Sequence, residues 1–176
     1  DIASIVPADF SLDVTLNKNR GITCVYAGNM FEVHKACCTF SKSTSMVKVG
    51  HKFDIVITTN SGYPLDMNLY QTVKGMSAAS SIVRTGGTII CAAECSDGIP
   101  EHGNYGSILS SADSPADLLE LITKPDYNRH DQWQVQIQAQ IQAKATVYVK
   151  SDYLTPSEIK KSHLQPIVDI QETISK

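Results

Sequence analysis

Three side chains near the start of a predicted helix, Tyr70, Gln71 and Lys74, have the types and the spacing to bind a small anion. At about 100° per residue, they share one sector of the helix in its first two turns. The apolar stripe on the opposite side comprises Leu69, Val73, Met76 and Val83. Unpaired backbone amides at a helix N-terminus favour an anion, so a phenol, an amide and an ammonium placed there could hold a carboxylate and one hydroxyl oxygen. The alternative interpretation is an ordinary solvated helix face.

This helix, predicted over residues 68–83, belongs to a predicted β–α–β unit. The segment 53–59 is a nearly continuous apolar run of the kind found in strands with both faces covered, and residues 88–93 form a second run after the stop at Gly86-Gly87. A crossover of this length pairs the two strands in parallel. Ligands of open α/β sheets bind just beyond the carboxyl ends of such strands. The predicted fold class is therefore α/β in three layers, a mostly parallel sheet with helices on both faces, Rossmann-like but without a dinucleotide fingerprint.

The flanking segments are predicted from alternation, periodicity and capping signals. The predicted strands cover residues 10–16, 22–27, 145–149 and 164–168, and the predicted helices cover residues 29–40, 115–122, 155–162 and 169–176. The segment 132–144 is ambiguous, because its apolar residues alternate with glutamine as in a strand, whereas Trp133, Ile137 and Ile141 recur every four residues as in a helix. Its Ala and Gln content and its length favour a helix. Residues 1–176 are expected to form a single α/β domain, with a leading strand pair in residues 1–28 near an interdomain junction.

The composition indicates a globular chain and argues against two classes of binding partner. The 176 residues are 42% hydrophobic, and 15 Lys and Arg against 18 Asp and Glu give a formal net charge of −3. This mild acidity, without a basic block, argues against nucleic acid and membrane as partners. The sequence contains no apolar run of about 18 residues, the length needed to span a bilayer. Five cysteines without zinc or redox spacing are expected to be reduced thiols in a cytoplasmic protein. Because the chain opens at Asp1 without a methionine, it is expected to be part of something longer.

Most strong catalytic signatures are absent from the sequence. It has no G-x-G-x-x-G after a strand, no Walker loop, no H-E-x-x-H and no G-x-S-x-G, which argues against the common nucleotide-binding, zinc-protease and hydrolase classes. The loop residues Asp97, Glu101 and His102 could ligate a cation, but a surface or cleft-rim loop is the expected interpretation. No metal site is therefore assigned. The histidines expected to be surface or satisfied residues are His34, His130 and His163.

Two blocks of sequence resemble the carboxy-terminal half of the nickel-dependent lactate racemase family. They are TTNSGYPLD at residues 58–66 and YQTVKGM at residues 70–76. The resemblance extends through residues 86–90, 97–103 and 131–134, and it covers most of the chain. Together the two blocks are a specific signature of the family, although either block alone would be a weak one.

The resemblance implies an isomerase that interconverts the enantiomers of a 2-hydroxy acid. In that family the cofactor is a nickel pincer nucleotide, which accepts a hydride from the substrate Cα and returns it to either face, while two histidines act as bases on the hydroxyl. The cofactor-attaching lysine, the nickel-binding histidine and both bases belong to an amino-terminal half that this sequence lacks. The resemblance therefore implies a substrate-facing carboxy-terminal domain, with the amino-terminal domain as its partner and no activity alone.

The family's site residues can be carried over at four positions. Gln71 and Lys74 match positions that hold the substrate's carboxylate and oxygens, Tyr70 matches one near cofactor and substrate, and Trp133 matches one that lines the pocket. Tyr70 and Lys74 are also implied as cofactor contacts. This set favours a short 2-hydroxy acid, lactate first, and a hydride can leave Cα only if the carboxylate is anchored. The alternative function is a stand-alone, non-catalytic α/β module that binds small anions.

Overall fold

The computed structural model describes residues 2–175. The chain divides into two compact units, Asp1–Val49 and Gly50–Lys176. The sequence predicted one α/β domain over residues 1–176, whereas the parallel sheet lies wholly in the second unit. The reason is that the two leading strands pair only with each other, so they form a small sheet of their own.

The first unit is an antiparallel hairpin followed by one long helix. Its elements are α1 (Ile2–Ile5), β1 (Ser11–Leu16), β2 (Ile22–Gly28) and α2 (Met30–Ser45). The turn forms because the side-chain carbonyl of Asn17 accepts hydrogen bonds from the backbone amides of Asn19 and Gly21, both at 2.9 Å. The helix begins after Asn29, whose side chain accepts from the Phe31 amide at 3.0 Å. The leading strand pair is therefore present as predicted.

One face of this hairpin is apolar and exposed. Side chains alternate along the two strands, and Val14 of β1 lies opposite Val25 of β2. The exposed apolar residues, between 41% and 64% accessible, are Leu12, Val14, Leu16, Ile22 and Val25. An apolar patch of this kind is typical of a surface that another part of a protein covers.

The second unit is built on a parallel sheet with the strand order β3-β4-β5-β6, which confirms the predicted α/β class. The strands are β3 (Phe53–Thr59), β4 (Val83–Ala92), β5 (Thr146–Lys150) and β6 (Gln165–Pro166). The helices are α3 (Leu69–Ser80), α4 (Tyr105–Leu109), α5 (Pro115–Ile122), α6 (Gln132–Lys144), α7 (Pro156–Lys161) and α8 (Ile170–Ile174).

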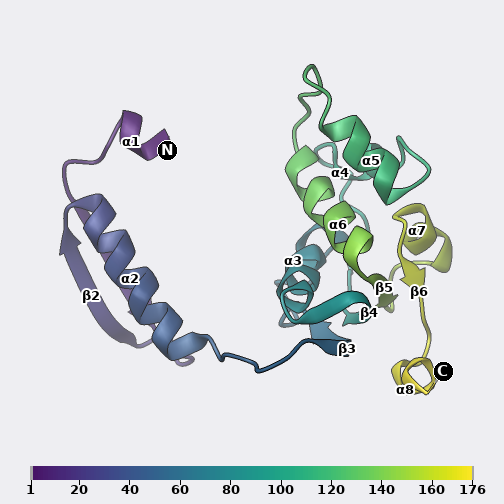
Figure 1. The fold of residues 1–176 in the computed structure, drawn as a ribbon, viewed down its shortest axis with the longest axis horizontal. Coiled ribbons are helices and arrows are strands. Elements are labelled where there is room, and N and C mark those ends of the chain that lie inside the picture. Colours follow the sequence, from purple (N-terminus) through teal and green to yellow (C-terminus); the bar gives the residue numbers. More distant parts are fainter. Residues whose placement is uncertain (1, 176) are drawn as a thin grey trace. The chain divides into compact units, whose positions relative to one another are not determined.

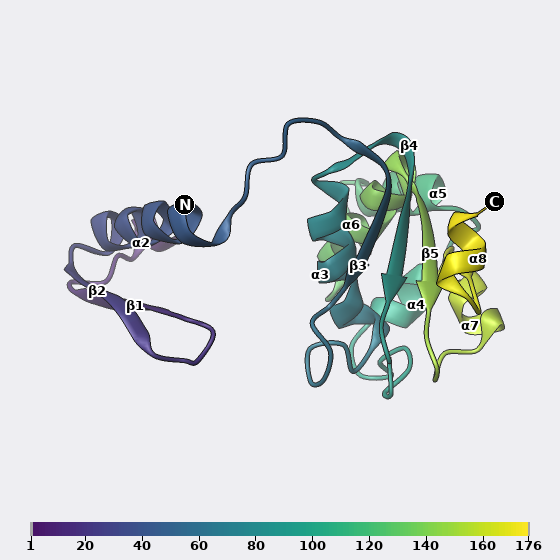
Figure 2. The same cartoon turned by 90° about the horizontal axis from the view of Figure 1, so that it is seen from below.

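The connecting helices gather on one face of this sheet. Helices α3 and α6 pack directly against it, with α4 and α5 beyond them (Figure 1). Strands in sequential order with right-handed crossovers place their connections on the same side. Helix α8 follows the last strand and lies on the opposite side of the sheet from α3 and α6 (Figure 1 and Figure 2). On that side Ile55 and Ile57 of the edge strand β3 are 40% and 53% exposed.

Three of the four residues of the apolar stripe predicted for α3 form its contact with the core, whereas the fourth, Val83, begins strand β4 because the helix ends at Ser80. Leu69, Val73 and Met76 are completely buried. Gly75 lets the helix lie directly on the end of β3, because a Cβ at this position would come within 2.5 Å of the Thr59 carbonyl oxygen. Lys74 is therefore exposed on the outer side of the helix, and the next residue, Gly75, forms the close contact with the strand.

The ambiguous segment 132–144 is helix α6, as predicted. Two of its glutamines are buried and connect it to neighbouring elements. Gln134 donates to the Tyr70 carbonyl at 2.6 Å, and Gln138 donates to the Ser162 carbonyl at 2.8 Å and accepts from the Tyr105 hydroxyl. Because these buried residues are polar, the apolar residues of segment 132–144 do not follow a clear helical period, which explains why the sequence was compatible with either a strand or a helix.

Two features of the second unit differ from the prediction. Strand β4 begins at Val83 and runs through the expected stop at residues 84–87, where its pairing with β3 shifts register. Gly87 lies so close to β3 that a Cβ there would come within 2.8 Å of the Asp54 carbonyl oxygen. Helix α4 has no counterpart among the predicted helices, because it has five residues and no side-chain cap.

All five cysteines are free. Within residues 2–175, no helix is long and apolar enough to cross a bilayer.

Candidate functional site

The first turns of α3 hold three of the predicted site residues. The helix begins after Asn68, whose side chain accepts from the Gln71 amide at 3.1 Å, and the Leu69 amide donates to the Gly98 carbonyl at 3.0 Å. Lys74 Nζ donates to Gln71 Oε1 at 2.6 Å. The cap and the loop after β4 therefore fix the helix start, and the ammonium and the amide of the predicted pair lie in contact.

Aromatic rings connect α3 to α6. The rings of Tyr70 and Trp133 meet edge to face, with centroids 5.9 Å apart at 86°, and the Tyr105 ring packs on Tyr70 at 5.3 Å. Trp133 is 50% exposed, although the next two residues of α6 are buried. Trp133 is thus a partly accessible ring beside Tyr70 and not an anchor of the core.

A cavity of about 270 Å³ opens beside these residues. Tyr70 and Gln71 line it, Lys74 contacts Gln71, and Trp133 contacts Tyr70. The remaining lining residues are Asn68, Pro100, His102, Gly103, His130 and Asp131. The structure therefore brings all four predicted site residues to this cavity or to a residue that lines it.

The cavity contains an aspartate–histidine pair that the sequence did not predict. Asp131 Oδ1 lies 3.1 Å from His130 Nδ1, and its Oδ2 accepts from the Asn104 amide at 2.9 Å. The loop before α4 approaches this carboxylate closely, since a Cβ on Gly103 would come within 2.1 Å of Asp131 Oδ2. His102 lies on the same loop and lines the cavity. The loop that holds His102 and Gly103 is far in sequence from the pair His130-Asp131. Only the positive φ of Gly103, 80°, is a feature that a residue type could have suggested.

The environment keeps the phenol of Tyr70 protonated. Burial raises its pKa above the ordinary value, and the nearby Asp131 carboxylate raises it further. A neutral phenol donates a hydrogen bond. The cavity therefore offers the Tyr70 phenol as a donor at neutral pH beside the Gln71 amide, and the ammonium of Lys74 contacts that amide.

The described residues contain no group of three or more His, Cys, Asp or Glu side chains arranged to hold a metal ion. His102 lines the cavity, while the Asp97 amide donates to the Met67 carbonyl at 2.7 Å and ties the loop to the start of α3. This loop therefore forms one wall of the cavity.

The fold and this cavity define an α/β unit that presents a phenol, an amide and an ammonium at a helix start, beyond the carboxyl end of a parallel strand. Residues 49–176 match the family model of the lactate racemase C-terminal domain, and the chain belongs to that family.

Two curated relatives are similar over nearly the whole chain. The lactate racemase of Lactiplantibacillus plantarum is 38% identical over 169 residues, 95% of this chain and 39% of the relative. The lactate racemase of Thermoanaerobacterium thermosaccharolyticum is 36% identical over 167 residues, 94% of this chain and 39% of the relative. The chain thus spans about two fifths of the length of these proteins.

A solved structure shares the fold. The lactate racemase apoprotein from Thermoanaerobacterium thermosaccharolyticum superposes with a TM-score of 0.88 at 32% identity. The match covers 98% of this chain and 42% of that protein. The similarity therefore includes the hairpin, α2 and the parallel sheet.

Proposed function

We propose that this chain is the substrate-facing part of a racemase that interconverts the enantiomers of a short 2-hydroxy acid, with lactate favoured. The observation that carries the proposal is the contact between Lys74 and Gln71 beside a cavity of about 270 Å³ in a member of the lactate racemase C-terminal domain family. The size suits a small acid, and the donors suit a carboxylate.

Lys74 and Gln71 would hold the substrate by its carboxylate. An ammonium supplies a point charge, and a charge-assisted hydrogen bond to a carboxylate is shorter and stronger than a neutral one. Because the Gln71 carbonyl accepts from Lys74, its NH₂ group remains to donate to a substrate oxygen. Anchoring the carboxylate leaves Cα free to present either of its two faces, which racemisation requires.

Tyr70 and Trp133 would form the wall of the site. The edge-to-face contact between their rings orders both side chains and presents an apolar surface with two donors, the phenol and the indole N–H. A wall of this kind excludes water, which strengthens the electrostatic interactions of Lys74 with a bound anion.

The described residues fit the family's nickel pincer nucleotide only as contributors to its surroundings. They contain no three-ligand group for nickel, whereas Lys74 and Tyr70 offer an ammonium and a donor to an anionic group of such a cofactor. When bound, the cofactor would supply the acceptor for the hydride that leaves Cα. We assign Lys74 and Tyr70 as its contacts in this chain, and the attaching lysine, the nickel ligand and the bases to the rest of a longer protein.

The partner would be the amino-terminal domain of that longer protein. Two observations support it: the chain spans 39% of its curated relatives, and the hairpin carries an exposed apolar face. The residues 1–28 would then lie near the interdomain junction. Such a protein would work in the cytoplasm, with free cysteines, and would bind neither nucleic acid nor membrane.

The test is complementation. The chain is mixed with the remainder of the longer protein, loaded with cofactor, and the conversion of D-lactate to L-lactate is followed by chiral chromatography. We expect racemisation from the mixture and none from the chain alone. Turnover by the chain alone would contradict the proposal. Saturable lactate binding without any gain of activity in a mixture shown to associate would favour the anion-binding module instead.

A further inference from the structure

A second cavity lies where the carboxyl ends of β4 and β5 meet the loop after β3. Its volume is about 360 Å³. The lining residues are Asp66, Ala92, Ala93, Glu94, Lys150, Ser151 and Asp152. This edge of a parallel sheet is the usual place for a ligand in α/β proteins.

The floor of the cavity is a buried carboxylate that is only half satisfied. Asp66 is 6% exposed, and its Oδ2 accepts from the Glu94 amide at 3.1 Å. Its Oδ1 is buried and has no hydrogen-bond partner among residues 2–175. Burying a polar oxygen without a hydrogen-bond donor costs free energy, so Asp66 is a side chain whose hydrogen-bonding capacity the described chain does not fill.

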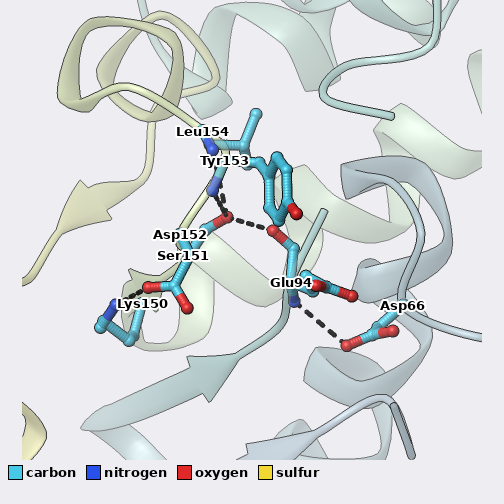
Figure 3. A network of polar contacts seen from close by, with 7 residues as sticks. All are labelled: Asp66, Glu94, Lys150, Ser151, Asp152, Tyr153 and Leu154. Atoms are coloured by element: carbon cyan, nitrogen blue, oxygen red, sulfur yellow. Dashed lines mark hydrogen bonds and ion pairs between the residues drawn. The ribbon is translucent and has the colours of Figure 1, made fainter. Parts of the chain in front are cut away.

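The polar network around Asp66 holds the cavity in shape (Figure 3). The Ser151 hydroxyl donates to the Glu94 carbonyl at 2.6 Å and accepts from the Leu154 amide at 3.2 Å, which joins the ends of β4 and β5. Lys150 is engaged with Asp152 in an ion pair. The side chains of Glu94 and Asp66 extend to the same side of the strand end (Figure 3).

The charge of the cavity favours a cation. Three carboxylates, those of Asp66, Glu94 and Asp152, line the cavity with one ammonium, that of Lys150, so the formal net charge of the lining is 1 − 3 = −2. Because Lys150 already pairs with Asp152, the carboxylates of Asp66 and Glu94 remain for a ligand. The described residues offer no three-ligand metal group, so the ligand must bring its own hydrogen-bond donors.

We propose that this cavity binds a guanidinium group. A guanidinium carries donors in a planar fork that can bridge two carboxylates, and its weakly hydrated faces suit the small apolar surface of Ala92 and Ala93. The group can come from a free guanidino compound or from an arginine side chain of the longer protein, and both sources present the same chemistry to Asp66.

Methylguanidinium chloride is the probe for this site, with methylammonium chloride and sodium chloride as matched salts. Backbone amide resonances of the ¹⁵N-labelled chain are followed at millimolar concentrations, with attention to Glu94 and Ser151. We expect saturable shifts of these amides with methylguanidinium, at least fivefold weaker binding of methylammonium, and no saturable shift with sodium chloride. Equal responses to all three salts would overturn the proposal.

Two variants and one control make the assignment specific. Asp66→Asn keeps an oxygen for the Glu94 amide but replaces the unpaired oxygen with an NH₂ group, so methylguanidinium binding should fall at least tenfold. Glu94→Gln changes an exposed side chain and should also weaken binding without threatening the fold. Asp126→Asn removes the same charge from an exposed position outside the cavity and should bind as the parent does. Unchanged binding in Asp66→Asn and Glu94→Gln would contradict the site.

The same titration of the longer protein distinguishes the two sources of the guanidinium group. If methylguanidinium no longer shifts the Glu94 amide there, and an Arg→Lys scan of the added residues restores the shift, an arginine of that protein fills the cavity. If the shift persists, the cavity serves a free guanidino compound. These measurements use no substrate turnover, so their outcome is separate from that of the proposed racemase function.

Discussion

The ammonium of Lys74 donates to the side-chain carbonyl of Gln71 across one turn of α3, with 2.6 Å between Nζ and Oε1. The contact fixes the orientation of the amide, because its oxygen faces Lys74 and its NH₂ group is left to donate elsewhere. Two adjacent donors, one of them charged, therefore lie beside the cavity lined by Tyr70 and Gln71.

Changing Gln71 should separate the roles of charge and hydrogen bonding. Gln71→Glu places a carboxylate against Lys74 and neutralises the charge available to the substrate, so kcat/KM of the complemented enzyme should fall roughly 10- to 150-fold, equivalent to about 1.5–3 kcal/mol. Gln71→Met removes the neutral amide, including the oxygen that accepts from Lys74, but leaves the charge of the site unchanged, and should cost about 2- to 13-fold in kcat/KM. Steady-state racemisation rates measure both losses. A larger loss of kcat/KM in Gln71→Met than in Gln71→Glu would disprove the prediction.

Trp133 should report ligand binding to the isolated chain. It is the single tryptophan of the sequence, it is 50% exposed, and its ring contacts Tyr70 beside the cavity. Titration with lactate at constant ionic strength should give a saturable change in its fluorescence, and Lys74→Ala should abolish that change. A response of the same size to sodium chloride would show that the emission senses ionic strength alone.

Gly75→Ala should destabilise the chain, against the usual preference of helices for alanine. The added Cβ would come within 2.5 Å of the Thr59 carbonyl oxygen, so α3 must move away from β3. We expect a loss of about 1–3 kcal/mol in the free energy of unfolding, measured by urea denaturation. Ser77→Ala, at an exposed position of the same helix, should change it by no more than about 0.5 kcal/mol. An increase in stability for Gly75→Ala would show that the contact is not close.

Stability should decline as pH falls through the range in which Glu158 titrates. Hydrogen bonds from the Thr155 hydroxyl and the Thr155 amide lower the pKa of Glu158 below its ordinary value of 4.5. A lowered folded-state pKa contributes stability that is present above the unfolded-state pKa and lost as pH falls through the folded-state pKa. Urea titrations from about pH 6 down to about pH 3 should therefore show a shallower decline in the free energy of unfolding for Glu158→Gln than for the parent chain. Parallel declines would contradict the capping role of the carboxylate.

The exposed hairpin face should be required for complementation. Replacing Leu12 and Val25 with serine removes apolar surface that the proposed partner domain would cover. We expect the concentration of chain that gives half-maximal activity to rise at least tenfold. Lys18→Ser in the exposed turn of the same hairpin is the control and should leave it unchanged. Unaltered complementation by the Leu12 and Val25 variant would place the partner elsewhere.

Much of the second unit could be predicted because its signals are local. The apolar run of β3, the stripe residues Leu69, Val73 and Met76 of α3, and the helix over residues 115–122 each depend on neighbouring residues, and each lies where the sequence indicated. Strand β4 starts earlier than predicted, because its glycines permit close contact with β3 and do not end the strand.

The candidate site could be predicted in part for the same reason. Tyr70, Gln71 and Lys74 belong to the first two turns of one helix, whereas Trp133 was predicted from the family resemblance. The contribution of His130 and Asp131 depends on the loop through Gly103, which packs against Asp131 just before α6, and no local sequence pattern indicates that contact. The half-satisfied carboxylate of Asp66 likewise exists only because β4 and β5 end beside it.

The most direct measurement is the effect of Lys74→Ala on lactate racemisation by the complemented, cofactor-loaded protein. If this ammonium anchors the substrate carboxylate, kcat/KM should fall roughly 10- to 150-fold, the equivalent of a charged hydrogen bond. Lys160→Ala, which removes an exposed ammonium from α7, should change nothing. An unchanged kcat/KM in Lys74→Ala, with complementation intact, would contradict the proposed site.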